Sequence, residues 1–200
     1  MTTEKEYTKP TYLEVSNHFL HDAIDFKTRY RYCIDSNGPL FYEPKSRRTK
    51  CFIDLRMGIE SALKASVCYY TYNERKGKTL VNWIEKFSHN IEKMVRKIDG
   101  KIPSEVLEPF KTNLLILDQL PVGLRYRLDT WNFEDNKNVL YHDTIGSNCW
   151  LESLYEALTV LIEHINFKLA SHNHFLSIGE ALEEIQTPSF KKYNKQTTQE

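Results

Sequence analysis

The chain has 200 residues, 40% of them hydrophobic and 27% charged, which is ordinary for a globular protein with a substantial core. Its Lys and Arg residues number 27, as do its Asp and Glu residues, so the formal net charge is +0. This balance excludes the strongly basic class of nucleic-acid binders, although it leaves room for a local basic patch.

Apolar residues that recur at helical spacing predict five main helices. In chain order these helices cover about residues 12–32, 48–72, 79–98, 104–120 and 149–170. The third is either one helix or two with a fresh start near Ser88. The fourth has Ser104 as its N-cap, and Pro109 either kinks it or marks a later start. Alternating, β-branched runs that would predict a sheet do not stand out in the sequence. The expected fold class is therefore all-α, a helical bundle.

The predicted domain organisation is a single helical bundle over residues 11–186, with a flexible N-terminus over 1–10 and a disordered polar tail over 187–200. A short helix at 177–185 is expected to belong to the bundle. The stretch 121–148 is irregular, and connections longer than about 15 residues are uncommon unless they are functional or partly structured.

The four cysteines are scattered along the chain without a C-x-x-C pair, at Cys33, Cys51, Cys68 and Cys149. This spacing predicts ordinary, partly buried thiols rather than a disulfide or zinc framework, and a reducing cytoplasm as the location. The sequence contains no run of about 18 apolar residues, so no transmembrane helix is predicted. The polar start MTTEKEYTKP lacks the apolar segment of a secretion signal.

The helix predicted at 48–72 carries Arg56, Glu60 and Lys64 in steps of four beside its apolar stripe. At 100° per residue Arg56 borders the stripe, Glu60 lies beside it, and Lys64 turns toward water. One interpretation is a surface ladder, in which the Glu60–Lys64 pair contributes about 0.2–0.5 kcal/mol. The other is that Arg56 and Glu60 are half buried and hold a charged group of another helix or of a partner. The first is the commoner use of such a pattern.

Two histidines are candidates for acid–base chemistry. His89 faces away from the apolar stripe if 79–98 is one helix, but it could face a cleft if a helix starts near Ser88. His142 lies in the irregular stretch next to Asp143 and could act as a general base. For both, an incidental polar histidine is the commoner alternative.

Glu14, His18, His21 and Asp25 could share a face of the first helix, but no second carboxylate–histidine pair of similar spacing occurs on another strong helix. We therefore predict no metal, and the absence of glycine-rich phosphate loops and of a nucleophile elbow predicts no cofactor. Tyrosines and arginines cluster in RYRYC and CYYTYNERK. Such residues stack on bases or anchor protein interfaces, and the second use is commoner in a neutral protein.

Three segments, LRMGIESALKAS, FSHNIEKMVRKI and LRY at Leu124 to Tyr126, together resemble the HEPN superfamily. Its members are helical bundles of prokaryotic defence and toxin–antitoxin systems. Many carry an Arg/Glu/Lys ladder, a histidine-led segment that opens the next helix, and an LRY-like element before a final long helix. The resemblance covers about Leu13 to Leu169. It implies that Arg56 and Glu60 face inward and hold the LRY segment, and that the binding residues are Arg56, Glu60, Lys64, Arg125 and Tyr126.

The chain departs from the family's ribonucleases, which use an arginine followed four to six residues later by a histidine and pair two such motifs across a dimer. No arginine here has a histidine at that distance. The resemblance therefore implies a non-catalytic protein that acts through protein association, as a homodimer or with another protein. Two alternatives stay open. One is a divergent RNA-directed nuclease or toxin with its site at Arg56, Glu60, His89, Arg125 and His142. The other is a mobile-element accessory protein of unknown partner.

Overall fold

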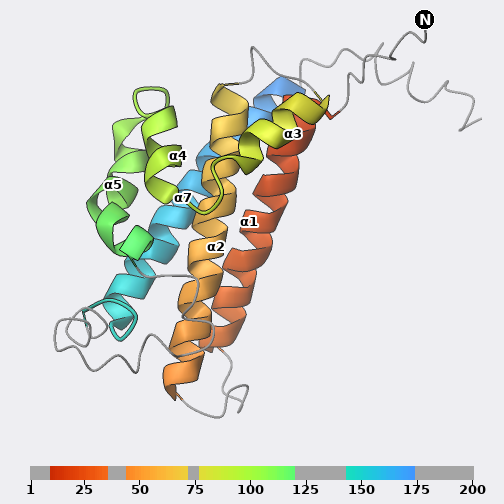
Figure 1. Ribbon diagram of the computed structural model, residues 1–200. Helices are drawn as coiled ribbons and strands as arrows, with labels where there is room; N and C mark the ends of the chain where they lie inside the picture. The colour runs from red at the N-terminus through yellow and green to blue at the C-terminus, as the bar shows by residue number, and fades with distance from the viewer. Residues whose placement is uncertain (1–9, 36–43, 72–76, 120–142, 174–200) are drawn as a thin grey trace, which may run out of the picture. The chain divides into compact units, whose positions relative to one another are not determined.

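A computed structural model describes residues 10–35, 44–71, 77–119 and 143–173 of the chain. These residues form helices and no strand, which confirms the all-α helical bundle. The helices are α1 (Tyr12–Asp35), α2 (Pro44–Tyr70), α3 (Gly77–Glu85), α4 (Ile91–Ile98), α5 (Ser104–Gln119) and α7 (Asn148–Asn173) (Figure 1). Among them, none is long and apolar enough to cross a membrane.

The chain divides into two compact units, 1–165 and 166–200, with the boundary inside α7. The first unit contains α1 to α5 and α7 up to Ile165. In the second unit, the described residues are 166–173. The expected helix at 177–185, the polar tail and nearly all of the expected flexible N-terminus lie outside the described residues. The domain bounds 11–186 stay a prediction.

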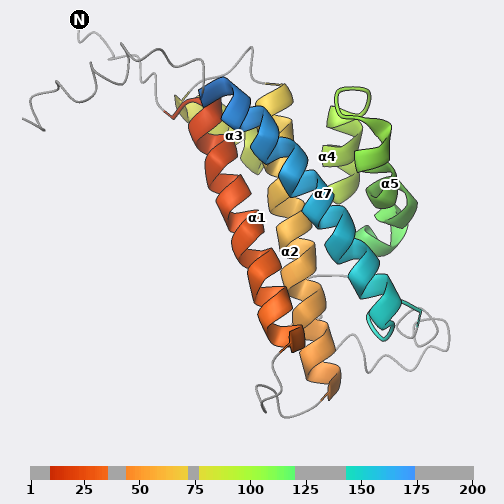
Figure 2. The same ribbon diagram turned by 180° about the vertical axis from the view of Figure 1, so that it is seen from behind.

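In the first unit α1 and α2 run side by side, and the N-terminal part of α7 crosses them obliquely (Figures 1 and 2), with Tyr155 against Tyr30 and Trp150 against Phe52. The apolar stripe predicted for α2 is completely buried at Phe52, Leu55, Ile59, Ala62 and Leu63. The stripe predicted for α7 is also buried, at Leu151, Leu154, Leu158, Leu161, Ile162 and Ile165. Helical periodicity therefore identified the core correctly, because one face of each long helix supplies it.

Gly58 lies where α1 and α7 both approach α2. A Cβ atom at this position would be 2.8 Å from Leu158 Cδ2 and 3.4 Å from Phe26 Cβ. The first distance is shorter than carbon atoms tolerate without movement. The missing side chain of Gly58 therefore allows the three helices to pack as closely as they do.

The predicted helix at 79–98 is two helices, so the one-helix alternative is wrong. Helix α3 ends at Glu85, and the turn that follows includes Ser88 in the left-handed region, with φ 47°. The fresh start comes later than Ser88: Asn90 is the N-cap of α4, and its Oδ1 accepts from Lys93 N at 2.6 Å.

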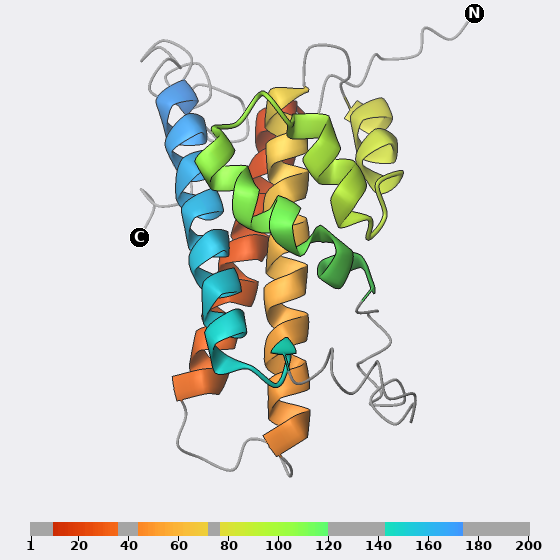
Figure 3. The ribbon, with the colours of Figure 1, turned by 90° about the vertical axis from the view of Figure 1, so that its left-hand side faces the viewer.

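Helices α4 and α5 cover one side of α2 (Figure 3): α4 packs against α2, and α5 packs against α4. Helix α5 starts at Ser104 and continues through Pro109, so the proline does not mark a later start. The apolar face of α4 is buried at Ile91, Met94, Val95 and Ile98. The side of α2 that carries Arg56 and Glu60 is therefore covered by protein.

Candidate functional site

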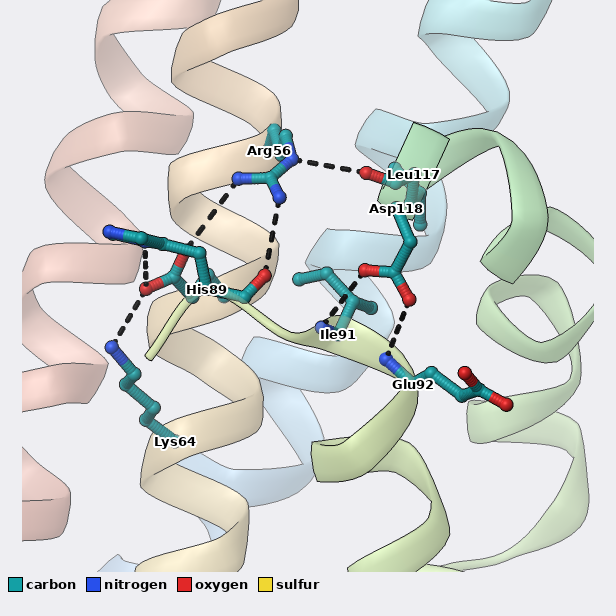
Figure 4. Close-up of polar contacts among 8 residues, drawn as sticks. Arg56, Lys64, His89, Ile91, Glu92, Leu117 and Asp118 are labelled. Carbon is teal, nitrogen blue, oxygen red and sulfur yellow. Dashed lines mark hydrogen bonds and ion pairs between the residues drawn. The ribbon is translucent and has the colours of Figure 1, made fainter. Parts of the chain in front are cut away.

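The charge ladder of α2 is buried under α4 and α5. Arg56 is 5% exposed and Glu60 is 2% exposed, while the Lys64 side chain is 16% exposed. The surface-ladder interpretation is therefore wrong for the first two residues, and their burial is more complete than half. We call Arg56, Glu60, Lys64 and His89 the charged cluster (Figure 4).

Arg56 binds the backbone of two segments that are distant in sequence. Its Nε donates to Leu117 O near the end of α5 at 3.1 Å, and its Nη2 donates to His89 O at 3.2 Å. The buried Nη1 makes no hydrogen bond with the described residues and lies 3.7 Å from Glu60 Oε2. Burial lowers the pKa of Arg56, and the nearby Glu60 and Asp118 carboxylates oppose that effect. The side chain remains a cation at neutral pH, because arginine loses its proton only under strongly basic conditions.

Glu60 is the anion at the centre of the charged cluster. Its Oε1 accepts from Lys64 Nζ at 2.7 Å, which confirms the predicted pair of residues four apart. His89 Nδ1 lies 2.9 Å from Oε2 and 3.1 Å from Oε1. A buried carboxylate is costly unless it is paired, and here two donors and the Arg56 cation surround it.

The His89 ring joins this buried anion to the surface. Its side chain is 56% exposed, and the second ring nitrogen points away from the carboxylate (Figure 4). In the neutral ring, donation from Nδ1 leaves Nε2 as an acceptor. The pair can therefore hold a proton-accepting nitrogen at the surface, which is the geometry of a carboxylate-oriented general base.

Asp118 fixes the segment that carries His89. Its Oδ1 accepts from Ile91 N at 3.1 Å and its Oδ2 accepts from Glu92 N at 3.2 Å, so a residue of α5 caps the start of α4 (Figure 4). With the Arg56–Leu117 bond next to it, this cap joins the end of α5, the start of α4 and the middle of α2. Asp118 was not among the site residues predicted from the sequence. The available signal was a lone acid after the apolar run LLIL.

The predicted site residues are only partly described. The structure brings Arg56, Glu60, Lys64 and His89 together, whereas Arg125, Tyr126 and His142 lie outside the described residues. Contact of Arg56 with the LRY segment therefore stays a prediction. In the part of the chain that the structure describes, no group of three His, Cys, Asp or Glu residues could hold a metal ion.

A second feature, which we call the α1–α2 hollow, is a pocket lined by residues of α1 and α2. It has a volume of about 680 Å³, and its lining includes Phe26, Ile53 and Met57. Ile53 lies 100° from Phe52 on the helical wheel, to one side of the α2 stripe, and this offset was the available sequence signal. The hollow adds a partly apolar surface, and its α2 residues Ile53 and Met57 each lie three residues before a member of the charged cluster.

Charged and aromatic residues border the α1–α2 hollow. Arg29 Nη2 lies 2.8 Å from Asp54 Oδ1, and Lys50 and Tyr32 also line it. Asp54 is buried whereas the Arg29 side chain is 63% exposed. Burial raises the pKa of the Asp54 carboxyl, and the Arg29 and Lys50 cations oppose that effect without cancelling it.

Comparison of the chain with family models, with curated proteins and with solved structures finds no match.

Proposed function

We propose that the protein is a non-catalytic helical bundle of the HEPN kind that acts by protein association, in the simplest case as a homodimer. The observation that carries this proposal is the α1–α2 hollow, where Ile53 and Met57 are partly exposed beside Tyr32, which is 67% exposed. Tyrosine and methionine are enriched in protein interfaces relative to the rest of protein surfaces.

The charged cluster supports a non-catalytic role. Two nitrogens of Arg56 are used by backbone carbonyls, and the Glu60 carboxylate is used by Lys64 and His89. These bonds fasten segments of the fold to one another, and buried groups held in this way are poorly placed to bind substrate. In this proposal the cluster makes the scaffold and the α1–α2 hollow makes the contact.

A second copy of the chain is the occupant we propose for the α1–α2 hollow. A two-fold interface brings the same surface patch of both copies together, so the patch must be self-complementary. The apolar lining satisfies this condition, because Ile53 and Met57 can pack against the same residues of the other copy, and Asp54 already neutralises Arg29 at 2.8 Å. The formal net charge of +0 adds no long-range repulsion between copies. The proposal includes a cytoplasmic setting in defence or toxin–antitoxin systems, or in a mobile element.

Size-exclusion chromatography with light scattering over a range of concentrations tests this proposal. We expect a dimer for the wild type and a shift to monomer for Met57→Glu, which places a charge in the hollow. Val160→Glu is the matched control, because Val160 is 46% exposed on α7 and does not line the hollow. A wild type that stays monomeric at every concentration, or a Met57→Glu protein that dimerises normally, contradicts the proposal.

The Glu60–His89 pair favours a second candidate function, an RNA-directed nuclease or toxin. His89 Nε2 would accept a proton from the attacking group while Glu60 orients the ring. Cleavage of RNA by the wild type should then fall at least about 100-fold in His89→Ala, the usual range for loss of a general base. His18→Ala, at an exposed position on α1, should keep full activity. RNA left intact by the wild type removes this candidate.

A further inference from the structure

The C-terminal end of α1 and the first turns of α2 bring two cysteines together. Arg47 on α2 donates from Nε to Cys33 O on α1 at 2.8 Å, and its Nη2 donates to Ile34 O. Cys51 follows Arg47 by four residues and therefore lies on the same face of α2, one turn further on. The side chains of Cys33 and Cys51 come close enough across the two helices for each thiol to influence the pKa of the other.

The two thiols differ in access. Cys51 is completely buried, whereas Cys33 is partly exposed and lines the α1–α2 hollow. A small reagent that enters the hollow can therefore reach Cys33 first, with Cys51 behind it. The other cysteines lack this arrangement: Cys68 is buried with its thiol directed to Tyr12 O, and Cys149 is exposed at the start of α7.

The surroundings favour ionisation of Cys33 over that of Cys51. Burial raises the pKa of both thiols, to about 12 for Cys51. At Cys33 the Arg29 and Arg47 cations and the neighbouring Cys51 thiol oppose that effect on the pKa, although they do not cancel it. Because the thiolate is the nucleophile, Cys33 is the better attacking group and Cys51 the better resolving group.

We propose that Cys33 and Cys51 form a disulfide when Cys33 reacts with hydrogen peroxide. The Cys33 thiolate attacks one peroxide oxygen, the O–O bond breaks, and the departing hydroxide takes up a proton to become water. The product is a sulfenic acid at Cys33. The Cys51 sulfur then attacks the Cys33 sulfur as it gives up its proton, and the S–O bond breaks with release of a second water. The two thiols are oxidised by two electrons, and the peroxide is reduced to two waters.

This reaction makes the pair a reversible modification site, whereas the scattered spacing had predicted ordinary thiols. The disulfide joins the end of α1 to the start of α2 and limits the freedom of the unfolded chain between them. In a reducing compartment such a bond is transient and is reversed by thiol exchange. The inference goes beyond the association proposed above and does not depend on it, because the cysteines lie within one chain.

The test uses the full chain carrying Cys149→Ser, which removes the exposed thiol. After treatment with hydrogen peroxide we expect two of the three remaining thiols to disappear, and peptide mapping without reductant to show Cys33 linked to Cys51. The melting temperature should rise by roughly 5–10 °C and return to its starting value with dithiothreitol. The reaction should accelerate between about pH 7 and pH 9, as more of Cys33 becomes thiolate.

Two further variants assign the roles of the thiols. With Cys51→Ser we expect a sulfenic acid at Cys33 that dimedone traps, and with Cys33→Ser we expect the loss of peroxide reactivity. Retention of all three thiols overturns the proposal. So does a bond to Cys68, a disulfide only between chains, or equal peroxide consumption by the Cys33→Ser protein.

Discussion

The two sides of α2 pack against their neighbours by different physical means. At Gly58 the helix meets α1 and α7 through apolar atoms so close that a Cβ atom would lie 2.8 Å from Leu158 Cδ2. At Arg56 and Glu60, the same helix meets α4 and α5 through charges that are 5% and 2% exposed. The residues at 56, 58 and 60 thus alternate between two kinds of interface within about one turn.

Each of the two interfaces of α2 depends on a different property. The side facing α1 and α7 depends on shape, because dispersion and burial act without direction but leave no room for extra atoms. The side facing α4 and α5 depends on pairing, because a buried charge that loses its partner is costly. Added volume should therefore damage the first side most, and a removed partner should damage the second.

The largest effect should come from breaking the charged side with Arg56→Ala. The change leaves the carbonyls of Leu117 and His89 without a donor and takes a cation from Glu60, so the free energy of unfolding should fall by about 3–5 kcal/mol. Urea denaturation measures it. Arg96→Ala is the control, since Arg96 is 77% exposed and its ion-pair partner among the described residues is Glu92, four residues earlier. Equal losses in both variants would mean that burial of Arg56 does not matter.

The next effect should come from breaking the apolar side with Gly58→Val. Overpacking should reduce the free energy of unfolding by about 1–3 kcal/mol. Gly58→Ala should lose less, since alanine gains about 1 kcal/mol of helix propensity over glycine. In a Leu158→Ala background, which clears the nearest atom, the valine should be better tolerated, and a thermodynamic cycle over the four proteins measures this coupling. Strictly additive losses at the two positions would argue against the contact.

A smaller loss of stability is expected when the cap on the start of α4 is removed. Asp118→Ala removes the acceptor for the backbone N–H groups of Ile91 and Glu92, so we expect a loss of about 1 kcal/mol, typical of a helix cap. Asp118→Asn keeps one oxygen acceptor and should lose less. Chemical denaturation of the two variants ranks them, and an inverted order would show that the carboxylate does not cap α4.

The smallest effect concerns the one buried carboxylate of the α1–α2 hollow. Burial raises the pKa of Asp54 above its ordinary value of 3.8, so the folded protein holds this proton more strongly than the unfolded chain. The contribution of Asp54 to stability is therefore greatest below about pH 3.8 and is lost as pH rises through its folded pKa. Asp54→Asn should raise the melting temperature relative to wild type more at pH 7 than at pH 3.5. A relative gain that is larger at pH 3.5 would contradict this sign.

The long helices were predictable from the sequence because their signal is local. Leu154, Leu158 and Leu161 recur at helical spacing in α7, and Leu55, Ile59 and Leu63 do so in α2. The break after α3 was left open, because it depends on the left-handed Ser88 and on Asp118, a cap supplied from α5. Local periodicity carries no information on either.

The site was predictable in composition but not in burial. The helical wheel placed Arg56 and Glu60 beside the apolar stripe, where a side chain is exposed or buried depending on what packs over it. Here the packing of α4 and α5 buries both residues. The Cys33–Cys51 pair was hidden for a similar reason, since its two members lie on different helices and meet through the register of α1 against α2.

The most direct test of the account is hydrogen exchange on Arg56→Met, which keeps the volume of the side chain and removes its charge. Arg56 holds the segment before α4 and the end of α5 against α2 through its bonds to His89 O and Leu117 O. Amides of Ile91–Ile98 should therefore lose protection in the variant by at least about tenfold relative to those of α1, equivalent to about 1.4 kcal/mol of local opening. Unchanged protection in α4, or a loss spread evenly over α1 and α4, would contradict the claim.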